Sequence, residues 1–206
     1  MVFNTRTHEH ASQTAGPYVH IGLVPPIAGL DNMYDGNYLG ATMVNENTRG
    51  ERVRIRGQIF DGFQTPLLDA IIELWQADAC GIFCSSQASS AKSDPNFMGW
   101  GRQPTSHDDG SFIFETIKPG KVPYKDTGIF QAPHICVWIA ARGINLGLHT
   151  RMYFSDEEEA NSTDPILNSI EHQSRVETLT AKLLRTGEYE FNIHLQGEHE
   201  TIFFDV

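Results

Sequence analysis

The sequence predicts an all-β fold, a β-sandwich of about seven to eight antiparallel strands with a long irregular N-terminal arm and short helices. Two observations favour this class: short apolar or alternating segments recur along the chain, and turn dipeptides separate them. With 206 residues, 40% of them hydrophobic and 20% charged, the chain has the size and composition of one globular domain, or of one domain with a substantial extension.

Residues 1–50 are expected to form the arm, and residues 51–206 the sandwich. Pro17, Pro25, Pro26 and several glycines interrupt the first segment, and no 3.6-residue period persists in it. An irregular segment of this length is unusual inside a compact domain, so we expect an arm or a functional wrap around another surface.

The first clear strand is expected at residues 52–60, where polar and apolar side chains alternate until the turn dipeptide Asp61-Gly62. Further strands are expected at 68–75, 111–117, 134–141, 149–154, 189–195 and 201–204. Two helices are expected, a short acidic one at 156–161 and a longer one at 164–184. The longer helix would begin at Asp164-Pro165, and apolar residues follow this dipeptide at roughly helical spacing.

The charge and the cysteines limit the possible partners and the compartment. Acidic residues outnumber basic ones by 26 to 15, so the net charge of −11 repels nucleic acid and anionic lipid. No apolar run approaches the ~20 residues that span a bilayer, and the polar first residues lack the apolar core of a secretion signal. Cys80, Cys84 and Cys136 cannot all pair within one chain, and their spacing does not match a zinc site, so we expect reduced thiols in a cytoplasm.

The histidines do not by themselves indicate a metal site. His8 and His10 form an H-x-H pair in a polar terminus, where disorder is the expected state. His134 opens a buried strand and is expected to be a hydrogen-bonded core residue. His149 and Arg151 lie on one face of another strand, where a surface or core-edge pair is expected. Because no G-x-S-x-G, P-loop or H-E-x-x-H motif is present, these residues alone name no reaction.

Several segments, taken together in their order and spacing, resemble the intradiol ring-cleavage dioxygenases over nearly the whole chain. They are SQTAGPY (12–18), GQIFDG (57–62), ELWQAD (73–78), DPNF (94–97), TIKPG (116–120), APHI (132–135) and LQGE (195–198). The stretch AARGIN (140–145), followed by HTR (149–151), is similar to the metal-free chain of two-subunit members of this family.

The resemblance implies four positions for the metal ligands of the family. Catalytic chains hold a non-haem Fe(III) with two tyrosines and two histidines, because phenolate is a hard anionic donor that stabilises ferric iron. In this chain the four positions are Phe83, Val122, His134 and Cys136, so one expected ligand is left. A vestigial, iron-free site is therefore expected. A substitute site made by Tyr124 and Cys136 is the alternative.

The resemblance also implies a role for the chain. It would be the iron-free subunit of an obligate, higher-order αβ assembly with a homologous β subunit that holds the Fe(III). The expected substrates are O₂ and a small aromatic acid, protocatechuate, cleaved to 3-carboxy-cis,cis-muconate. Two alternatives stay open, a related enzyme for another anionic catechol such as 4-sulfocatechol and a β-sandwich that binds aromatic acids without turning them over.

Five residues of this chain are expected to contact the substrate. The resemblance assigns Arg142 to the substrate carboxylate, which a planar guanidinium can meet with two parallel hydrogen bonds. It places Thr14, Gly16, Pro17 and Tyr18 near the aromatic ring or its carboxylate. The competing interpretations are a structural ion pair for Arg142 and an ordinary Gly-Pro turn in a mobile arm.

Overall fold

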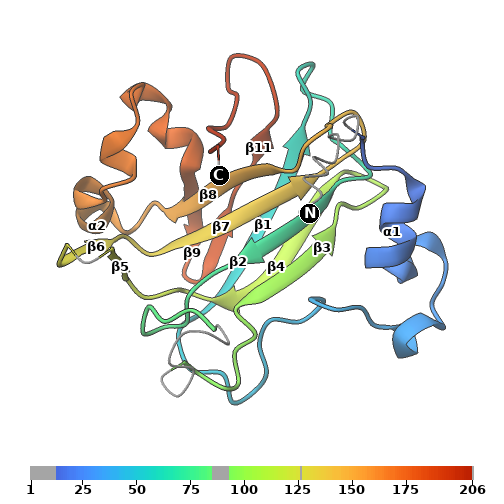
Figure 1. Cartoon of the computed structure of the whole chain (residues 1–206), viewed down its shortest axis with the longest axis horizontal. Helices are drawn as coiled ribbons and strands as arrows, with labels where there is room; N and C mark the ends of the chain where they lie inside the picture. Colours follow the sequence, from blue (N-terminus) through green and yellow to red (C-terminus); the bar gives the residue numbers. More distant parts are fainter. Residues whose placement is uncertain (1–12, 85–92, 126, 206) are drawn as a thin grey trace, which may run out of the picture.

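A computed structural model describes residues 13–84, 93–125 and 127–205, so His8 and His10 lie outside the described residues. The fold consists of two layers of β-strands with short helical segments at opposite ends (Figure 1). The strands are β1 (Arg52–Phe60), β2 (Ile71–Trp75), β3 (Trp100–Pro104), β4 (Ser111–Ile117), β5 (Val122–Tyr124), β6 (Ile129–Gln131), β7 (His134–Ala140), β8 (Leu148–Phe154), β9 (Thr180–Arg185), β10 (Glu188–Glu190) and β11 (Ile193–His194). The helical segments are α1 (Pro17–Leu23), α2 (Glu158–Thr163) and the 3₁₀ turns η1 (Pro25–Ala28), η2 (Met33–Gly36), η4 (Leu167–Ser169) and η5 (Gln173–Leu179).

The strands form one large mixed sheet that folds over on itself. One half contains β4, β1, β10, β11 and β9, and the other contains β8, β7, β2 and β3. The parallel pair β8·β9 joins the halves, while β5 and β6 form a separate hairpin. The all-β class is therefore confirmed. The expectation of purely antiparallel strands is wrong for three pairs, β1·β10, β1·β11 and β8·β9, because β9, β10 and β11 return to their neighbours through crossovers.

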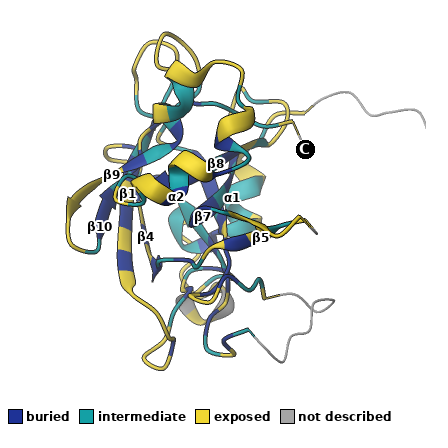
Figure 2. Cartoon of the chain, turned by 90° about the vertical axis from the view of Figure 1, so that its left-hand side faces the viewer, coloured by how far each residue is buried: buried dark blue, intermediate teal, exposed yellow. Residues whose placement is uncertain are grey.

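The core lies between the two halves of the sheet. Residues of β1 alternate between exposed and buried, and Ile55 and Ile59 point inward. From the facing half, Ile135, Val137 and Ile139 of β7 enter the same hydrophobic cluster. Burying an aliphatic side chain of this size stabilises the fold by about 1.5–3 kcal/mol. Figure 2 shows buried residues concentrated on the strands, while exposed residues lie on helical segments, on loops and on outer strands such as β9. Because β7 buries its odd-numbered residues, its even-numbered residues face the outside of the sheet.

The predicted helix at 164–184 is wrong. The segment contains η4, η5 and then strand β9. The carboxylate of Asp164, which is 0% exposed, accepts hydrogen bonds from the N–H groups of Ile166 and Leu167 and so caps the start of this segment, which continues only as short 3₁₀ turns. From Thr180 onward the chain is extended, because it pairs with Tyr153 of β8. Tertiary pairing here overrides the local apolar spacing. The shorter predicted helix is observed, two residues later, as α2.

Other boundaries also differ from the expectation. Strand β3 and the β5–β6 hairpin were not expected, and the region 189–195 is split into β10 and β11. In the predicted strand 201–204 the structure has an isolated bridge, Phe204 to His149. Among the described residues no helix has the length and apolar character of a membrane span.

The described part of the arm lies against the sandwich. Short helical segments interrupt it, including α1, which its sequence did not predict. Val24 and Met43 are buried, and Val44 bridges to Phe97. A proline at the first position of α1 explains how a helix of seven residues can begin there. That this segment wraps a partner stays a prediction.

Candidate functional site

The first candidate site is the outer face of β7, where the four expected ligand positions were assigned. His134 is the first residue of β7 and is 3% exposed. Cys136 follows two residues later on the same face. Val122 opens β5 and is buried, and Phe83 is half-buried in the loop after β2.

The loops that carry Phe83 and Val122 lie against each other. The N–H of Gly120 donates to the carbonyl oxygen of Asp78 at 2.9 Å. A Cβ at Gly81 would lie 2.0 Å from the carbonyl oxygen of Lys121, and Gly81 has φ +78°, so this contact requires glycine. The hairpin that begins at Val122 then leads into β7. Neighbouring segments thus carry the four positions.

The chemistry of these residues does not fit a ferric ion. Phenylalanine and valine offer no donor atom. The Nδ1 atom of His134 lies 2.7 Å from the carbonyl oxygen of Ala132, and burial lowers the pKa of His134 to about 4 in spite of that contact. Burial also raises the pKa of the Cys136 thiol, which is therefore protonated at neutral pH.

A guanidinium occupies the same face. Arg151 of β8 is the register partner of Cys136, and its Nη1 donates to Oε1 of Gln131 at 2.8 Å. A fixed positive charge here opposes the binding of a metal cation. In the part of the chain that the structure describes, no cluster of three or more His, Cys, Asp or Glu side chains could hold a metal ion.

Tyr124 does not improve the site. Strand β5 is extended, so Tyr124 shares a face with Val122. Val122 pairs with Gln131, whereas Tyr124 pairs with Ile129, which lies two residues farther from β7 along the chain. The Nζ atom of Lys125 lies 5.1 Å from the centre of its ring. A cation at this distance disfavours a second cation at the phenol.

The second candidate site lies at the opposite end of β7. The strand ends at Ala140, and Arg142 follows in a turn closed by the hydrogen bond from the N–H of Ile144 to the carbonyl oxygen of Ala141. The side chain of Arg142 is 68% exposed, and its Nη2 atom lies 2.8 Å from Oδ2 of Asp69. The structure therefore contains the ion pair that was the competing interpretation of Arg142, and it leaves most of the Arg142 side chain exposed.

Two hydrogen bonds of Thr14 hold the N-terminal segment against the turn at Ala141–Gly143. The hydroxyl of Thr14 accepts a hydrogen bond from the N–H of Gly143 at 2.7 Å and donates to the carbonyl oxygen of Ala141 at 3.3 Å. Gly16 and Pro17 begin α1 and line a cavity of about 210 Å³ together with Arg142. The structure thus brings four of the five predicted substrate contacts together. The fifth, Tyr18, is 85% exposed and lies outside the lining of this cavity.

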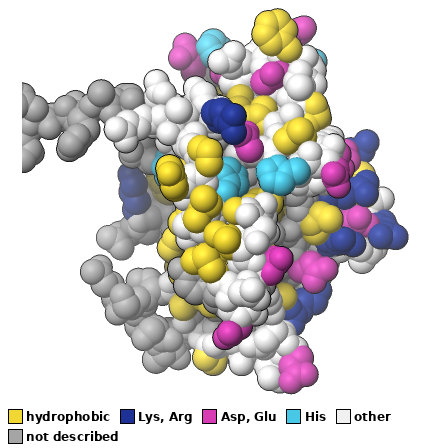
Figure 3. Space-filling view, turned by 90° about the vertical axis from the view of Figure 1, so that its right-hand side faces the viewer, with side chains coloured by type: hydrophobic (Ala, Val, Ile, Leu, Met, Phe, Trp, Pro, Cys, Tyr) yellow, Lys and Arg dark blue, Asp and Glu magenta, His cyan; other side chains and the backbone are white. Residues whose placement is uncertain are grey.

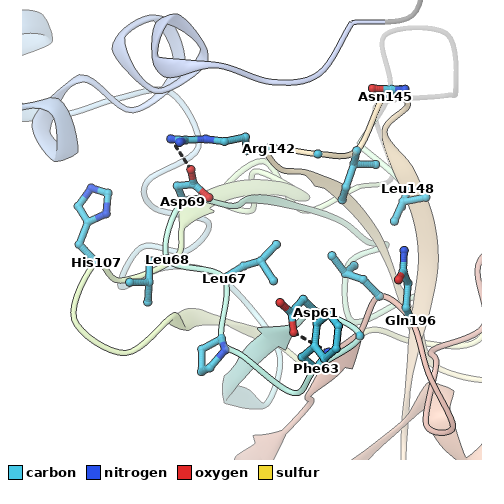
Figure 4. Close-up of a pocket in the computed structure, with 15 residues that line it drawn as sticks. Asp61, Phe63, Leu67, Leu68, Asp69, His107, Arg142, Asn145, Leu148 and Gln196 are labelled. Carbon is cyan, nitrogen blue, oxygen red and sulfur yellow. Dashed lines mark hydrogen bonds and ion pairs between the residues drawn. The ribbon is translucent and has the colours of Figure 1, made fainter.

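A larger cavity of about 920 Å³ adjoins the smaller one, and Asp69, His107 and Arg142 line both. Its apolar wall contains Phe63, Leu67, Leu68, Ile144 and Leu148. Figure 4 shows Arg142 and Asp69 on one side of this cavity, with Phe63 and Gln196 on the opposite side. An aromatic ring with one anionic group matches this combination of apolar surface and a single accessible arginine.

Sequence reasoning missed Asp69, His107 and His20 as members of this site. His20 of α1 lines the smaller cavity, and its buried Nε2 atom has no hydrogen-bond partner among the described residues. Burial lowers the pKa of His20, although the Asp69 carboxylate acts in the other direction. A single sequence carries no signal for these neighbours, because strand register and the docking of α1 create them.

Comparisons with known proteins show which sequences and folds this chain is similar to. A family model described as Dioxygenase matches residues 35–197. The protocatechuate 3,4-dioxygenase alpha chain of Pseudomonas putida is 42% identical over 200 residues, which cover 96% of each chain. The protocatechuate 3,4-dioxygenase beta chain of Burkholderia cepacia is 29% identical, over 85% of this chain and 78% of its own. The crystal structure of 3-chlorocatechol 1,2-dioxygenase from Rhodococcus opacus 1CP matches the fold with a TM-score of 0.58 at 22% identity, covering 76% of this chain and 64% of that one.

Proposed function

The chain belongs to the dioxygenase family whose model spans residues 35–197, and we propose that it is the iron-free α subunit of a heteromeric intradiol dioxygenase. The enzyme cleaves protocatechuate with O₂ to 3-carboxy-cis,cis-muconate. One observation carries the proposal, the 42% identity over nearly the full length to a protein named as such an alpha chain. The three cysteines of the chain are free, which is compatible with the cytoplasm as its location.

The partner in this proposal is a homologous β subunit. A protein named as a beta chain is itself a relative of this chain, so the two subunits would be similar folds that pair. Figure 3 shows apolar side chains gathered on the face that carries α1, with histidines and a basic side chain among them. Phe63 and Leu146, which are 93% and 74% exposed, also lie near the Arg142 site. Exposed apolar surface of this kind is typical of an interface.

The Fe(III) would be held by the β subunit and not by this chain. Of the four expected ligand positions, two have no donor, one is a protonated thiol and one is a neutral imidazole beside Arg151. We therefore assign no step of the reaction to the outer face of β7.

The work of this chain is to bind and orient the substrate. The guanidinium of Arg142 would pair with the carboxylate of protocatechuate, and the backbone of Gly16 and Pro17 would pack against the ring. Glycine and proline suit this role, because glycine lacks a side chain and proline fixes φ. Holding the ring in one orientation and excluding water lowers the entropic part of the barrier without any redox chemistry in this chain.

The test is to purify the chain alone and together with a β chain, and to measure iron content and visible absorbance. We expect a colourless, iron-free chain alone and a coloured complex whose spectrum changes when protocatechuate is added. Iron with a tyrosinate absorption in the lone chain would contradict the proposal and would point first to Tyr124. Steady-state rates with 4-sulfocatechol decide whether the preferred anion is a carboxylate or a sulfonate.

A further inference from the structure

We infer that Asp69 is a positioning residue that orients Arg142 toward the anionic group of the substrate. The inference rests on the proposed function, because it concerns the same guanidinium. It adds a residue that neither the sequence nor the likeness to other proteins assigns. It also gives the Asp69–Arg142 ion pair a role in substrate recognition, in addition to its structural role at the end of a strand.

The sheet register creates the ion pair. In the antiparallel pair β2·β7 the last partners at this end are Ile71 and Ala140. Asp69 lies two residues before Ile71, and Arg142 lies two residues after Ala140. Continuing this register by two residues on each strand would place Asp69 opposite Arg142, and although the ladder itself ends at Ile71 and Ala140, the two side chains meet there in the ion pair. The carboxylate is therefore held where the turn brings the arginine.

The two partners differ in how firmly they are held. The residue after Asp69 is Ala70, which is 0% exposed. The N–H of Ala70 donates to the hydroxyl of Thr105 at 2.9 Å, and the carbonyl oxygen of Ala70 accepts from the N–H of Thr105 at 2.9 Å. Arg142 instead lies in a turn and has a long side chain that is 68% exposed. A side chain of this kind loses many rotamers when it is ordered. The backbone beside Asp69 is thus anchored, and the Asp69 carboxylate restricts the more exposed Arg142 side chain before the substrate arrives.

The contact also leaves donors for the substrate. An arginine has five N–H donors, and the ion pair with Asp69 joins Nη2 to Oδ2. The remaining edge of the guanidinium can meet a planar carboxylate. His20 and His107 are the other titratable groups that face this region, and Asp69 is the acidic group that acts on His20. Asp69 thus lies beside Arg142 and the two histidines in the lining of the smaller cavity.

The experiment uses the purified complex with the β chain and four variants of this chain, Asp69→Asn, Asp69→Glu, Arg142→Ala and the double variant Asp69→Asn/Arg142→Ala. Values of KM and kcat are measured for protocatechuate and for unsubstituted catechol. We expect Asp69→Asn to raise KM for protocatechuate about fivefold, the size of a partly exposed ion pair, with kcat and the catechol KM unchanged. Asp69→Glu keeps the charge and should stay within about twofold of the parent.

The double variant separates positioning from a general structural effect. If Asp69 acts through Arg142, Asp69→Asn has no further effect once Arg142 is alanine. A matched control is Glu200→Gln, which breaks the partly exposed ion pair with Arg175 and should leave both KM values unchanged.

Each outcome has one meaning. The inference would be overturned if the effects of the two substitutions on KM add in the double variant, or if Asp69→Asn changes KM equally for both substrates. It would also be overturned if Asp69→Asn lowers KM for protocatechuate, because the Asp69 carboxylate would then compete with the substrate. If Arg142→Ala itself fails to separate the two substrates, the carboxylate role in the proposed function fails instead. Loss of complex formation by Asp69→Asn together with full activity of Asp69→Glu would still support a need for the charge.

Discussion

The two ends of strand β7 have opposite chemical character. At its start, His134 is 3% exposed and its Nδ1 atom contacts the carbonyl oxygen of Ala132, while Arg151 is the register partner of the half-buried Cys136. Just beyond its end, Arg142 is largely exposed and borders two cavities. One strand thus separates a closed region that serves the fold from an open region that can serve a ligand. The residues expected as ligands lie at the closed end, and those expected at the substrate lie at the open end.

The largest effect is expected at the closed end, from Asp164→Ala. The buried carboxylate accepts hydrogen bonds from the N–H groups of Ala132, Ile166 and Leu167 at 2.7, 2.8 and 2.9 Å. Removing it leaves buried donors unpaired, so the free energy of unfolding should fall by about 4 kcal/mol. Denaturant unfolding measures this, with exposed Asp31→Ala as the control. A change below about 1 kcal/mol would show that the closed end does not depend on this network.

A second effect of similar origin concerns pH. Burial holds the pKa of His134 at about 4, against 6.5 in an unfolded chain. Between about pH 4 and pH 6.5, His134 is protonated in the unfolded chain and neutral in the folded chain. Stability from this residue is therefore full above pH 6.5 and is lost as the pH falls toward 4, by an amount on the order of 3 kcal/mol. Unfolding measured from pH 7.5 to 4 should show a shallower decline in His134→Asn, whereas exposed His149→Asn should follow the parent.

At the open end, Arg142→Ala should affect function more than stability. Loss of a charge-assisted contact of about 2 kcal/mol corresponds to roughly a thirtyfold rise in KM for protocatechuate. Unsubstituted catechol has no carboxylate, so its KM should change little. Arg142→Lys keeps the charge but not the planar fork, and should give an intermediate value. Equal effects on both substrates would remove the distinction between the two ends of β7.

The smallest effect is expected from Thr14→Val, which keeps the shape of the side chain and removes its hydroxyl. Two hydrogen bonds to the turn at Ala141 and Gly143 are lost, at a cost of about 1 kcal/mol. The N-terminal segment should detach more often, so limited proteolysis should cut it faster while the sandwich stays intact. Thr127→Val, in the β5–β6 hairpin, provides a threonine control. An unchanged cleavage rate would mean that other contacts of the arm hold it in place.

The sequence predicted those parts of the fold whose local pattern agrees with their tertiary role. The alternation of residues 52–60 predicted β1, and the apolar run from His134 predicted β7. The segment 164–184 failed, because its apolar spacing suits a helix while its C-terminal part pairs with β8. Strand β3 was missed because Gly101 and Pro104 lower the strand propensity of this segment and its adjacent polar residues Arg102 and Gln103 give no alternation.

The same reasoning explains the candidate site. Arg142, Thr14, Gly16 and Pro17 could be named from the resemblance alone, and the structure brings them together. Asp69 could not be named, because its position opposite Arg142 follows from the register between two strands about seventy residues apart. Long-range neighbours of this kind become visible only when the pairing of strands is known.

The pairing of β1 has a consequence for synthesis on the ribosome. This strand, at residues 52–60, needs β4 on one edge and β10 and β11, at residues 188–194, on the other. Until residues 188–194 have been translated, one edge of β1 offers unpaired N–H and carbonyl groups to any other strand. Contacts so distant in sequence slow folding and lengthen that exposure. We therefore expect the yield of native chain to depend on translation speed and chaperone supply more than on the stability of the finished fold.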